Sequence, residues 1–232
     1  MNIVVAFSPV NYKDERRRKA QEVAVRVLSH APSFVYPVAF DFLKDSSPIS
    51  VVEECNIPTL NILKRDSVKT ISNTRRLPYI KEILELCSKI DCDIFGYINS
   101  DILVDENVYQ NLFEDKDAFI FSRSDIGEVS VEDFLAGKSK VIYGGDKHIG
   151  ADGFFFNKEW WLKNRQRFPS GLIIGSTEWD TCYRYIIKKL TANFVESRSL
   201  YHVYHNQTWT TTSPSALNNI AIWNEIKNKG LY

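Results

Sequence analysis

The sequence predicts an α/β fold in which a mostly parallel mixed sheet is flanked by helices. In the first half of the chain, short apolar runs of strand length alternate with amphipathic segments of helix length, which is typical of parallel strands joined by helices. The second half mixes the two patterns more freely. The chain has 232 residues and shows no linker, internal repeat or low-complexity tract, so one domain is expected.

Each element of the first half follows from the spacing of its apolar residues. Ile3–Phe7 is an apolar run that ends at Ser8-Pro9, which predicts a strand and a turn. Residues 14–29 place apolar side chains at helical spacing and predict an amphipathic helix. Residues 34–40 predict a second strand, in which Pro37 favours an edge or a bulge. Weaker signals follow: a turn-rich stretch over 46–58 and a short strand over 60–63.

Pro78 is expected to be the first residue of a helix, a position that suits proline. That helix leads into Ile94–Ile98, a short apolar run that predicts a buried strand. The same signals predict the remaining elements: a helix capped by Asp105 and running to 113, a strand over 118–122, an irregular stretch over 124–145, a strand over 153–156, helices over 158–165 and 176–189, one or two strands over 192–204, and a last helix opened by Ser213-Pro214.

Composition limits the classes of function. The chain carries 29 basic and 29 acidic residues, so no basic excess favours nucleic acid or an acidic membrane surface as a partner. No run approaches the ~20 apolar residues of a transmembrane helix, and the first residues do not resemble a signal peptide. The four cysteines form no Cys-x-x-Cys pair, which predicts free thiols in a reducing compartment. A cytoplasmic protein is therefore expected.

The first candidate site follows the strand Ile94–Ile98. Asn99, Ser100 and Asp101 come directly after it. In open α/β sheets, ligands bind in the crevice beyond the carboxyl ends of the strands. A Mg²⁺ ion in such a crevice uses one or two protein carboxylates together with substrate phosphates. Asp101 is therefore a candidate ligand for a cation that holds a diphosphate, although an aspartate at a strand end is also a common turn former.

Two later segments carry further acids. Residues 144–153 contain four glycines and Asp152, and they lead into an aromatic strand. Glycine lets the backbone approach a ligand closely, and the alternative is a surface loop. Glu178 and Asp180 flank Trp179 at a predicted helix start, where the helix dipole alone would stabilise acids. A tryptophan between two acids also suits a sugar platform beside a general base.

His202 and His205 stand three residues apart near the end of the strand expected over 192–204. Side chains alternate along a strand, so this spacing would place the two rings on opposite faces. We therefore expect one of them, preferably His205 beside a polar segment, to complete a metal site with Asp101. A single histidine is otherwise more often an ordinary core or surface residue than a ligand.

Taken in order, these segments resemble the GT-A nucleotide-sugar glycosyltransferases, and among them the small nucleotide-diphospho-sugar transferase-like proteins. The pattern is a Tyr-Ile-Asn-Ser-Asp-Ile strand, a Gly-x-Asp-x-Phe-x-Phe strand, a Trp-Asp helix start and a late histidine. In this chain the pattern falls on 97–102, 150–156, Trp179-Asp180 and His202 or His205, and the stretches 57–60 and 77–80 also match. The resemblance implies a single GT-A (Rossmann-like) domain over 1–232, with 1–104 as its nucleotide-binding half and 105–232 as its acceptor-binding half.

The resemblance also implies an activity and its residues. It implies a glycosyltransferase that uses Mn²⁺ or Mg²⁺ to move a hexose or deoxyhexose from a nucleotide-diphospho-sugar to a hydroxyl of a carbohydrate or glycoconjugate acceptor. Asp101 would coordinate the metal with His205 or His202. Glu178 and Asp180 match the family's acidic catalytic motif, and Asp152 is the rival base. The donor would meet residues of the first-strand loop, two arginines suited to a diphosphate, the metal-binding turn and the tryptophan, namely Ser8, Pro9, Val10, Asn11, Arg75, Arg76, Asn99, Ser100, Asp101 and Trp179.

Two other functions stay open. A sugar nucleotidyltransferase shares this architecture, but it usually has a glycine-rich loop with Arg and Lys after the first strand. Ser8-Pro9-Val10-Asn11 contains none of these residues, which counts against it. A degenerate transferase fold that only binds a nucleotide or sugar is the third reading. Asn99 favours it, because the family's metal-binding element has an aspartate at that position and this chain has one charge fewer.

Overall fold

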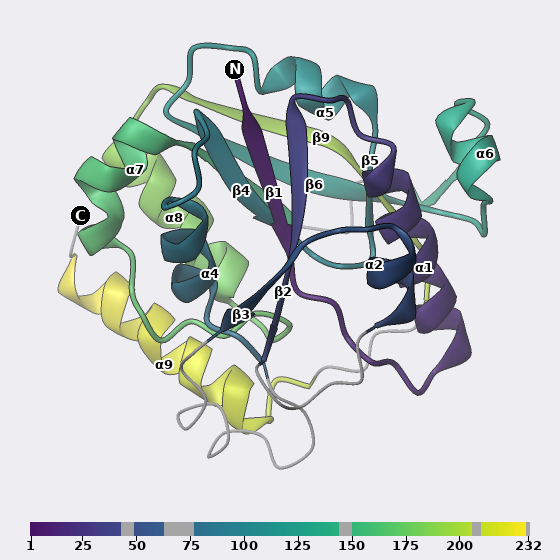
Figure 1. Cartoon of the computed structure of the whole chain (residues 1–232). Helices are drawn as coiled ribbons and strands as arrows, with labels where there is room; N and C mark the ends of the chain where they lie inside the picture. Colours follow the sequence, from purple (N-terminus) through teal and green to yellow (C-terminus); the bar gives the residue numbers. More distant parts are fainter. Residues whose placement is uncertain (43–48, 63–76, 144–149, 206–209, 231–232) are drawn as a thin grey trace.

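The computed structural model describes residues 1–42, 49–62, 77–143, 150–205 and 210–230, and its strands form one nine-stranded sheet (Figure 1). The order across the sheet is β3-β2-β1-β4-β8-β6-β9-β5, and β7 pairs with β6. The expected α/β class is confirmed. The strands are β1 (Ile3–Phe7), β2 (Val35–Phe42), β3 (Thr59–Ile62), β4 (Ile94–Ile98), β5 (Ile102–Val104), β6 (Ala118–Ile126), β7 (Val141–Tyr143), β8 (Gly153–Asn157) and β9 (Phe194–Val203).

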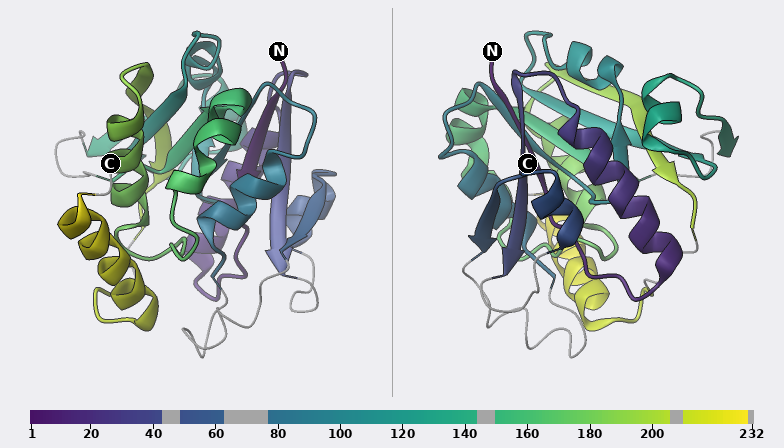
Figure 2. Two further views of the ribbon diagram at one scale, coloured as in Figure 1. Left: turned by 90° about the vertical axis from the view of Figure 1, so that its left-hand side faces the viewer. Right: turned by 45° about the vertical axis from the view of Figure 1, so that its right-hand side comes forward.

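Helices cover both faces of the sheet (Figures 1 and 2). They are α1 (Glu15–Ser29), α2 (Ser50–Glu54), α4 (Ile80–Cys87), α5 (Glu106–Asn111), α6 (Val131–Leu135), α7 (Lys158–Asn164), α8 (Trp179–Leu190) and α9 (Pro214–Lys229). Successive side chains of a strand point to opposite faces. In β4, Phe95 and Tyr97 therefore pack with α4, α7 and α8, whereas Ile94 and Ile98 pack with α1, α2 and α5.

The N-terminal half of the sheet is parallel. β1 pairs in parallel with β2 on one side and with β4 on the other, and β2 pairs in parallel with β3. Pro37 of β2 lies opposite Val5 of β1, and the pairing with β3 begins only at Ala39. The proline thus lies where β2 has a strand on one side only, which agrees with the expected edge position.

Strand β8 is antiparallel and lies between β4 and β6. Its first residue, Gly153, pairs with Ile98, the last residue of β4, so the segment before β8 meets the segment after β4. Gly96 allows this close pairing, because a Cβ there would lie 2.3 Å from the carbonyl oxygen of Phe154. β6 and β9 run in parallel, in the direction of β4, so the carboxyl ends of these strands share one edge of the sheet.

Some expected elements differ from the structure. The stretch 46–58 contains α2. The stretch 124–145 contains all of α6 and β7 as well as the last residues of β6. β5 was not predicted. These elements are short, so each offers too few turns or alternations for a periodic signal. α4 begins at Ile80 and not at Pro78, because Tyr79 is extended and forms a bridge with Ile173. α8 begins three residues later than expected, after Glu178.

Within the described ranges, no helix combines the length and the apolar composition that a membrane crossing requires. The four cysteines are unpaired, and burial raises the pKa values of the Cys87 and Cys182 thiols. Both thiols therefore stay protonated and unreactive near neutral pH.

Candidate metal and donor site

The turn after β4 places Asp101 at the carboxyl edge of the sheet. β4 ends at Ile98, and the N–H of Ile102 donates to the carbonyl oxygen of Asn99 at 3.2 Å, which closes the turn. Asp101 is nearly buried, with 8% of its surface exposed. The carboxylate therefore stands at the strand end where the sequence predicted it.

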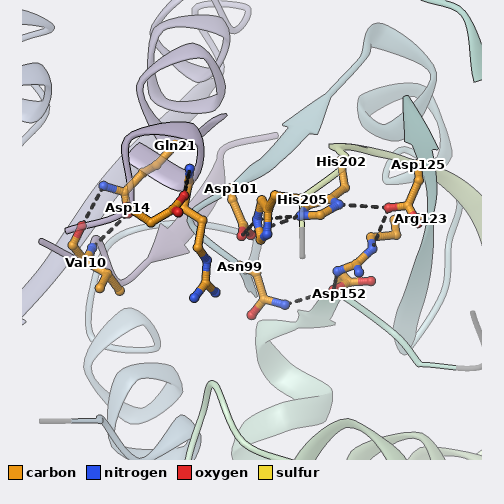
Figure 3. Close-up of polar contacts among 11 residues, drawn as sticks. Val10, Asp14, Gln21, Asn99, Asp101, Arg123, Asp125, Asp152, His202 and His205 are labelled. Carbon is orange, nitrogen blue, oxygen red and sulfur yellow. Dashed lines mark hydrogen bonds and ion pairs between the residues drawn. The ribbon is translucent and has the colours of Figure 1, made fainter. Parts of the chain in front are cut away.

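Both histidines face Asp101 (Figure 3). The Nε2 atoms of His202 and His205 lie 3.0 Å apart, and they lie 3.6 and 3.2 Å from Oδ2 of Asp101. The expectation that only one ring would point at the site is therefore wrong. β9 ends at Val203, so the alternation of a strand applies to His202 but no longer to His205.

These three atoms have the spacing of ligands around one metal ion. Ligand atoms about 2.1 Å from an ion lie about 3.0 Å apart when they are at right angles and about 3.4 Å apart in a tetrahedron. The observed separations run from 3.0 to 3.6 Å. One carboxylate oxygen and two imidazole nitrogens form a usual donor set for a divalent ion. Three protein ligands would also leave coordination positions open for a substrate.

Charge in this cluster favours an ionised carboxylate. Burial would raise the pKa of Asp101, but hydrogen bonds with His202 and His205 and the positive charge of Arg123 outweigh it and hold that pKa well below its ordinary value. Burial would lower the pKa of His202, but its hydrogen bonds with Asp101 and Asp125 outweigh that effect and raise it. An ion that bound here would therefore meet a charged oxygen and would compete with a proton for Nε2 of His202.

A buried network continues behind the histidines, and sequence reasoning missed it. Oδ1 of Asp125 lies 2.8 Å from Nδ1 of His202 and 3.3 Å from Nε of Arg123. Nη1 of Arg123 donates to Oδ1 of Asp152 at 2.9 Å, and Nδ2 of Asn99 donates to the same oxygen at 2.9 Å (Figure 3). The expected strand ended at 122 and residues 124–145 were expected to be irregular, whereas β6 continues to Ile126 and places residues 123 and 125 on one face.

The two rival acids differ in their surroundings. The carboxylate of Asp152 is 3% exposed and is held by Asn99 and Arg123. Asp180, the second residue of α8, is less buried, and its Oδ2 accepts a hydrogen bond from the N–H of Ala151 at 3.1 Å. Burial and the negative charge of Asp152 raise the pKa of Asp180 from 3.8 to about 6. Asp180 therefore has the properties of an acid–base group, and Asp152 those of a fixed structural charge.

Trp179 and Glu178, which precede Asp180 in the chain, have different surroundings from it. Trp179 is 4% exposed, and its ring meets the rings of Tyr97 and Phe154 edge to face, with centroids 5.9 and 5.6 Å apart. The expectation that it stacks on a sugar is therefore wrong, because the indole is part of the core. Glu178 is partly exposed and has a φ of 67°, a left-handed conformation that is uncommon for a residue with a side chain.

Gln21 of α1 holds the loop after β1 in place. The sequence alone did not single out this residue. The N–H of Val10 donates to Oε1 of Gln21 at 2.8 Å, and Nε2 of Gln21 donates to the carbonyl oxygen of Val10 at 3.0 Å (Figure 3). Both backbone groups of Val10 are thus engaged within the protein. Ser8 is nearly buried, and Pro9 and Asn11 are more exposed. Arg75, Arg76 and the glycine-rich residues 144–149 lie outside the described residues.

Several solved structures resemble this chain. TarS residues 1–349 from S. aureus match with a TM-score of 0.55 and 12% identity, over 88% of this chain and 60% of that one. A candidate nucleotide-diphospho-sugar transferase from Desulfovibrio desulfuricans G20 matches with a TM-score of 0.51 and 12% identity, over 98% and 96% of the two chains. Glucosyl-3-phosphoglycerate synthase from Mycobacterium tuberculosis matches with a TM-score of 0.50 and 13% identity, over 88% and 73%.

These likenesses concern the fold. The chain has the GT-A-like fold of nucleotide-diphospho-sugar transferases, as the sequence motifs predicted. It spans about three fifths of the TarS segment that it matches. No protein-family model and no curated protein sequence matches the chain.

Proposed function

We propose that this protein is a metal-dependent glycosyltransferase that moves a sugar from a nucleotide-diphospho-sugar to an acceptor hydroxyl. The observation that carries the proposal is the convergence of Asp101, His202 and His205 at the carboxyl edge of a nucleotide-sugar transferase fold. At this edge of the sheet, these residues would hold a divalent ion that could also bind diphosphate oxygens.

Asp101, His202 and His205 would hold the ion. Two imidazoles make this donor set softer than the all-oxygen sets that Mg²⁺ prefers, so Mn²⁺ is the better candidate. When bound, the ion would supply positive charge that offsets the charge on the departing nucleotide diphosphate. Asn99 and Ser100 lie in the same turn and would border the diphosphate, and Asn99 is already held by Asp152.

Asp180 is the best candidate for the general base. A base must be ionised at the working pH and must retain enough affinity for a proton to remove one from a hydroxyl. The raised pKa of Asp180, about 6, meets both requirements. Asp152 is the weaker candidate, because Nη1 of Arg123 and Nδ2 of Asn99 both donate to its Oδ1 and occupy that oxygen. In an inverting reaction Asp180 would take the proton of the acceptor hydroxyl, and in a retaining reaction it would only orient the substrates.

The donor's nucleoside would lie against the loop after β1. Ser8, Pro9, Val10 and Asn11 form this loop, and Gln21 keeps it in one conformation through its two hydrogen bonds with Val10. A loop that is fixed before binding loses little conformational entropy when it meets a ligand. Arg75 and Arg76 remain candidates for the diphosphate because guanidinium groups pair well with phosphate oxygens.

A screen of nucleotide-sugars, with and without Mn²⁺, tests this function. We expect one donor to be hydrolysed slowly, with release of the nucleoside diphosphate, and only when the ion is present. Asp101→Ala should lose this reaction, and Asp91→Ala, at an exposed position before β4, should keep it. A nucleotidyltransferase would instead need a nucleoside triphosphate and a sugar, and would release pyrophosphate. A binding module would bind a nucleotide or sugar and release no product.

A further inference from the structure

The ring of His202 has a partner on each side. Its Nε2 faces Asp101 and His205, where the proposed ion would bind. Its other nitrogen, Nδ1, lies 2.8 Å from Oδ1 of Asp125 (Figure 3). Asp125 lies on β6, and its carboxylate contacts the ring on the side away from the ion.

This contact determines which nitrogen of His202 can bind a metal. An ionised carboxylate only accepts hydrogen bonds, so Nδ1 must carry a hydrogen to pair with Asp125. In the neutral ring the other nitrogen, Nε2, then carries the lone pair. That lone pair points to the same place as Nε2 of His205 and Oδ2 of Asp101. Without Asp125 the ring could carry its hydrogen on either nitrogen.

Asp125 is itself held in place. The carboxylate is 18% exposed, and the buried guanidinium of Arg123 lies 3.3 Å from the oxygen that His202 contacts. Arg123 also binds Asp152, so it cannot easily turn away. Arg123 and His202 therefore hold the same oxygen of Asp125 between them and fix the position of the carboxylate against the ring.

A bulge in β9 brings the two residues together. Up to Ser122 of β6, the partner residue on β9 is 76 positions later in the chain, as in the pair Ser122 and Arg198. From Arg123 the partner is 77 positions later, as in the pair Asp125 and His202, so Ser199 is an extra residue in β9. A shift of one residue turns every later side chain to the other face of a strand. Without the bulge, His202 would point away from the face that carries Asp125.

We propose that Asp125 positions His202 for metal binding, as a carboxylate that fixes the ring and its tautomer from the second coordination sphere. The proposal rests on the proposed metal site and adds to it a residue that does not touch the ion. Carboxylates of this kind change metal affinity by about 10- to 100-fold. Asp125→Asn keeps the shape of the side chain, but its amide can donate to Nδ1 and so permits the tautomer in which Nε2 carries the hydrogen.

A double-mutant cycle on the full chain tests the proposal. Mn²⁺ affinity would be measured by calorimetry for the parent, Asp125→Asn, His202→Ala and the double variant, with thermal melts to establish that each is folded. We expect Asp125→Asn to weaken Mn²⁺ binding about 10- to 100-fold in the parent and to have no further effect when His202 is already alanine. Asp133→Asn is the matched control and should bind Mn²⁺ as the parent does, because Asp133 lies on α6 in an exposed ion pair with Lys138.

Two results would overturn the positioning role. One is an Asp125→Asn variant that binds Mn²⁺ as tightly as the parent. The other is an equal loss of affinity with and without His202, because Asp125 would then act on the site by another route. If the parent binds no Mn²⁺ and does not differ from Asp101→Ala, the metal site itself is refuted, and with it the proposed function.

Discussion

Replacing Asp180 with asparagine is expected to make the protein more stable above neutral pH. Burial and the charge of Asp152 raise the pKa of Asp180 from 3.8 to about 6. A shift of this size corresponds to about 3 kcal/mol. A carboxyl group whose pKa is raised in the folded state contributes stability that is fully present below its unfolded pKa and is lost as the pH rises through about 6. Above pH 7 the parent therefore bears a cost that the neutral amide avoids.

Urea unfolding at several pH values measures this effect. Asparagine keeps an oxygen that can accept the hydrogen bond from Ala151, so most of the gain should be realised. We expect Asp180→Asn to raise the free energy of unfolding by about 1 to 3 kcal/mol at pH 8. The difference from the parent should shrink towards zero near pH 4. Asp91→Asn, at an exposed position, is the control and should follow the parent at every pH.

The same variant should lose activity while it gains stability. Removal of a general base lowers turnover by about 10²- to 10⁴-fold, and donor affinity should change little. In the parent, turnover should fall about tenfold for each pH unit below 6, because Asp180 becomes protonated there. The reasoning fails if Asp180→Asn is no more stable than the parent at pH 8. If Asp180→Asn keeps full turnover and Asp152→Asn abolishes it, the base belongs to the glycine-rich loop.

Three further predictions concern the metal and the sheet. Asp101→Ala should abolish the Mn²⁺-dependent binding of UDP, GDP or CDP in calorimetry while its melting temperature stays near that of the parent; unchanged binding would exclude Asp101 as a ligand. His202→Ala and His205→Ala should each weaken Mn²⁺ affinity, since both rings face Asp101, and an effect from only one of them would contradict the three-ligand site. Gly96→Ala should destabilise the fold by about 1 to 3 kcal/mol or more, because its Cβ would lie 2.3 Å from a backbone oxygen of β8. Gly127→Ala, where the nearest atom is 3.4 Å away, is the control for Gly96, and equal stability of these two variants would show that β8 can move aside.

The parts of the fold that sequence predicted well are those with strong local signals. β1 and β4 have the expected bounds, because each is a five-residue apolar run with polar residues at its end. α1 begins after Asp14, whose side chain accepts from the N–H of Arg17 and caps the helix as its residue type suggests. The position of Asp101 followed from β4 alone. In each case a short window of sequence contains the information.

The parts that sequence missed depend on pairing between distant segments. Asp125 meets His202 only because Ser199 is an extra residue in β9, and the sequence of β9 gives no local signal of this bulge. Trp179 was expected to face a sugar because two acids flank it, but burial of the indole depends on Tyr97 and Phe154. Local sequence cannot distinguish an aromatic residue in a cleft from one in the core.

Under the proposed function, the charges of the site favour a metal ion that binds before the donor. Four carboxylates, those of Asp101, Asp125, Asp152 and Asp180, interact with one another directly or through Arg123 within the described residues. One guanidinium cannot balance them, and a nucleotide diphosphate would add further negative charge. A divalent ion held by Asp101 and the two histidines would place positive charge where the diphosphate would lie. Asp180 is farther along the network, beside Asp152, where burial and the negative charge of Asp152 raise its pKa and favour proton removal. The same group of acids can therefore support an anionic substrate at one end and a base at the other, provided that the ion occupies only the first.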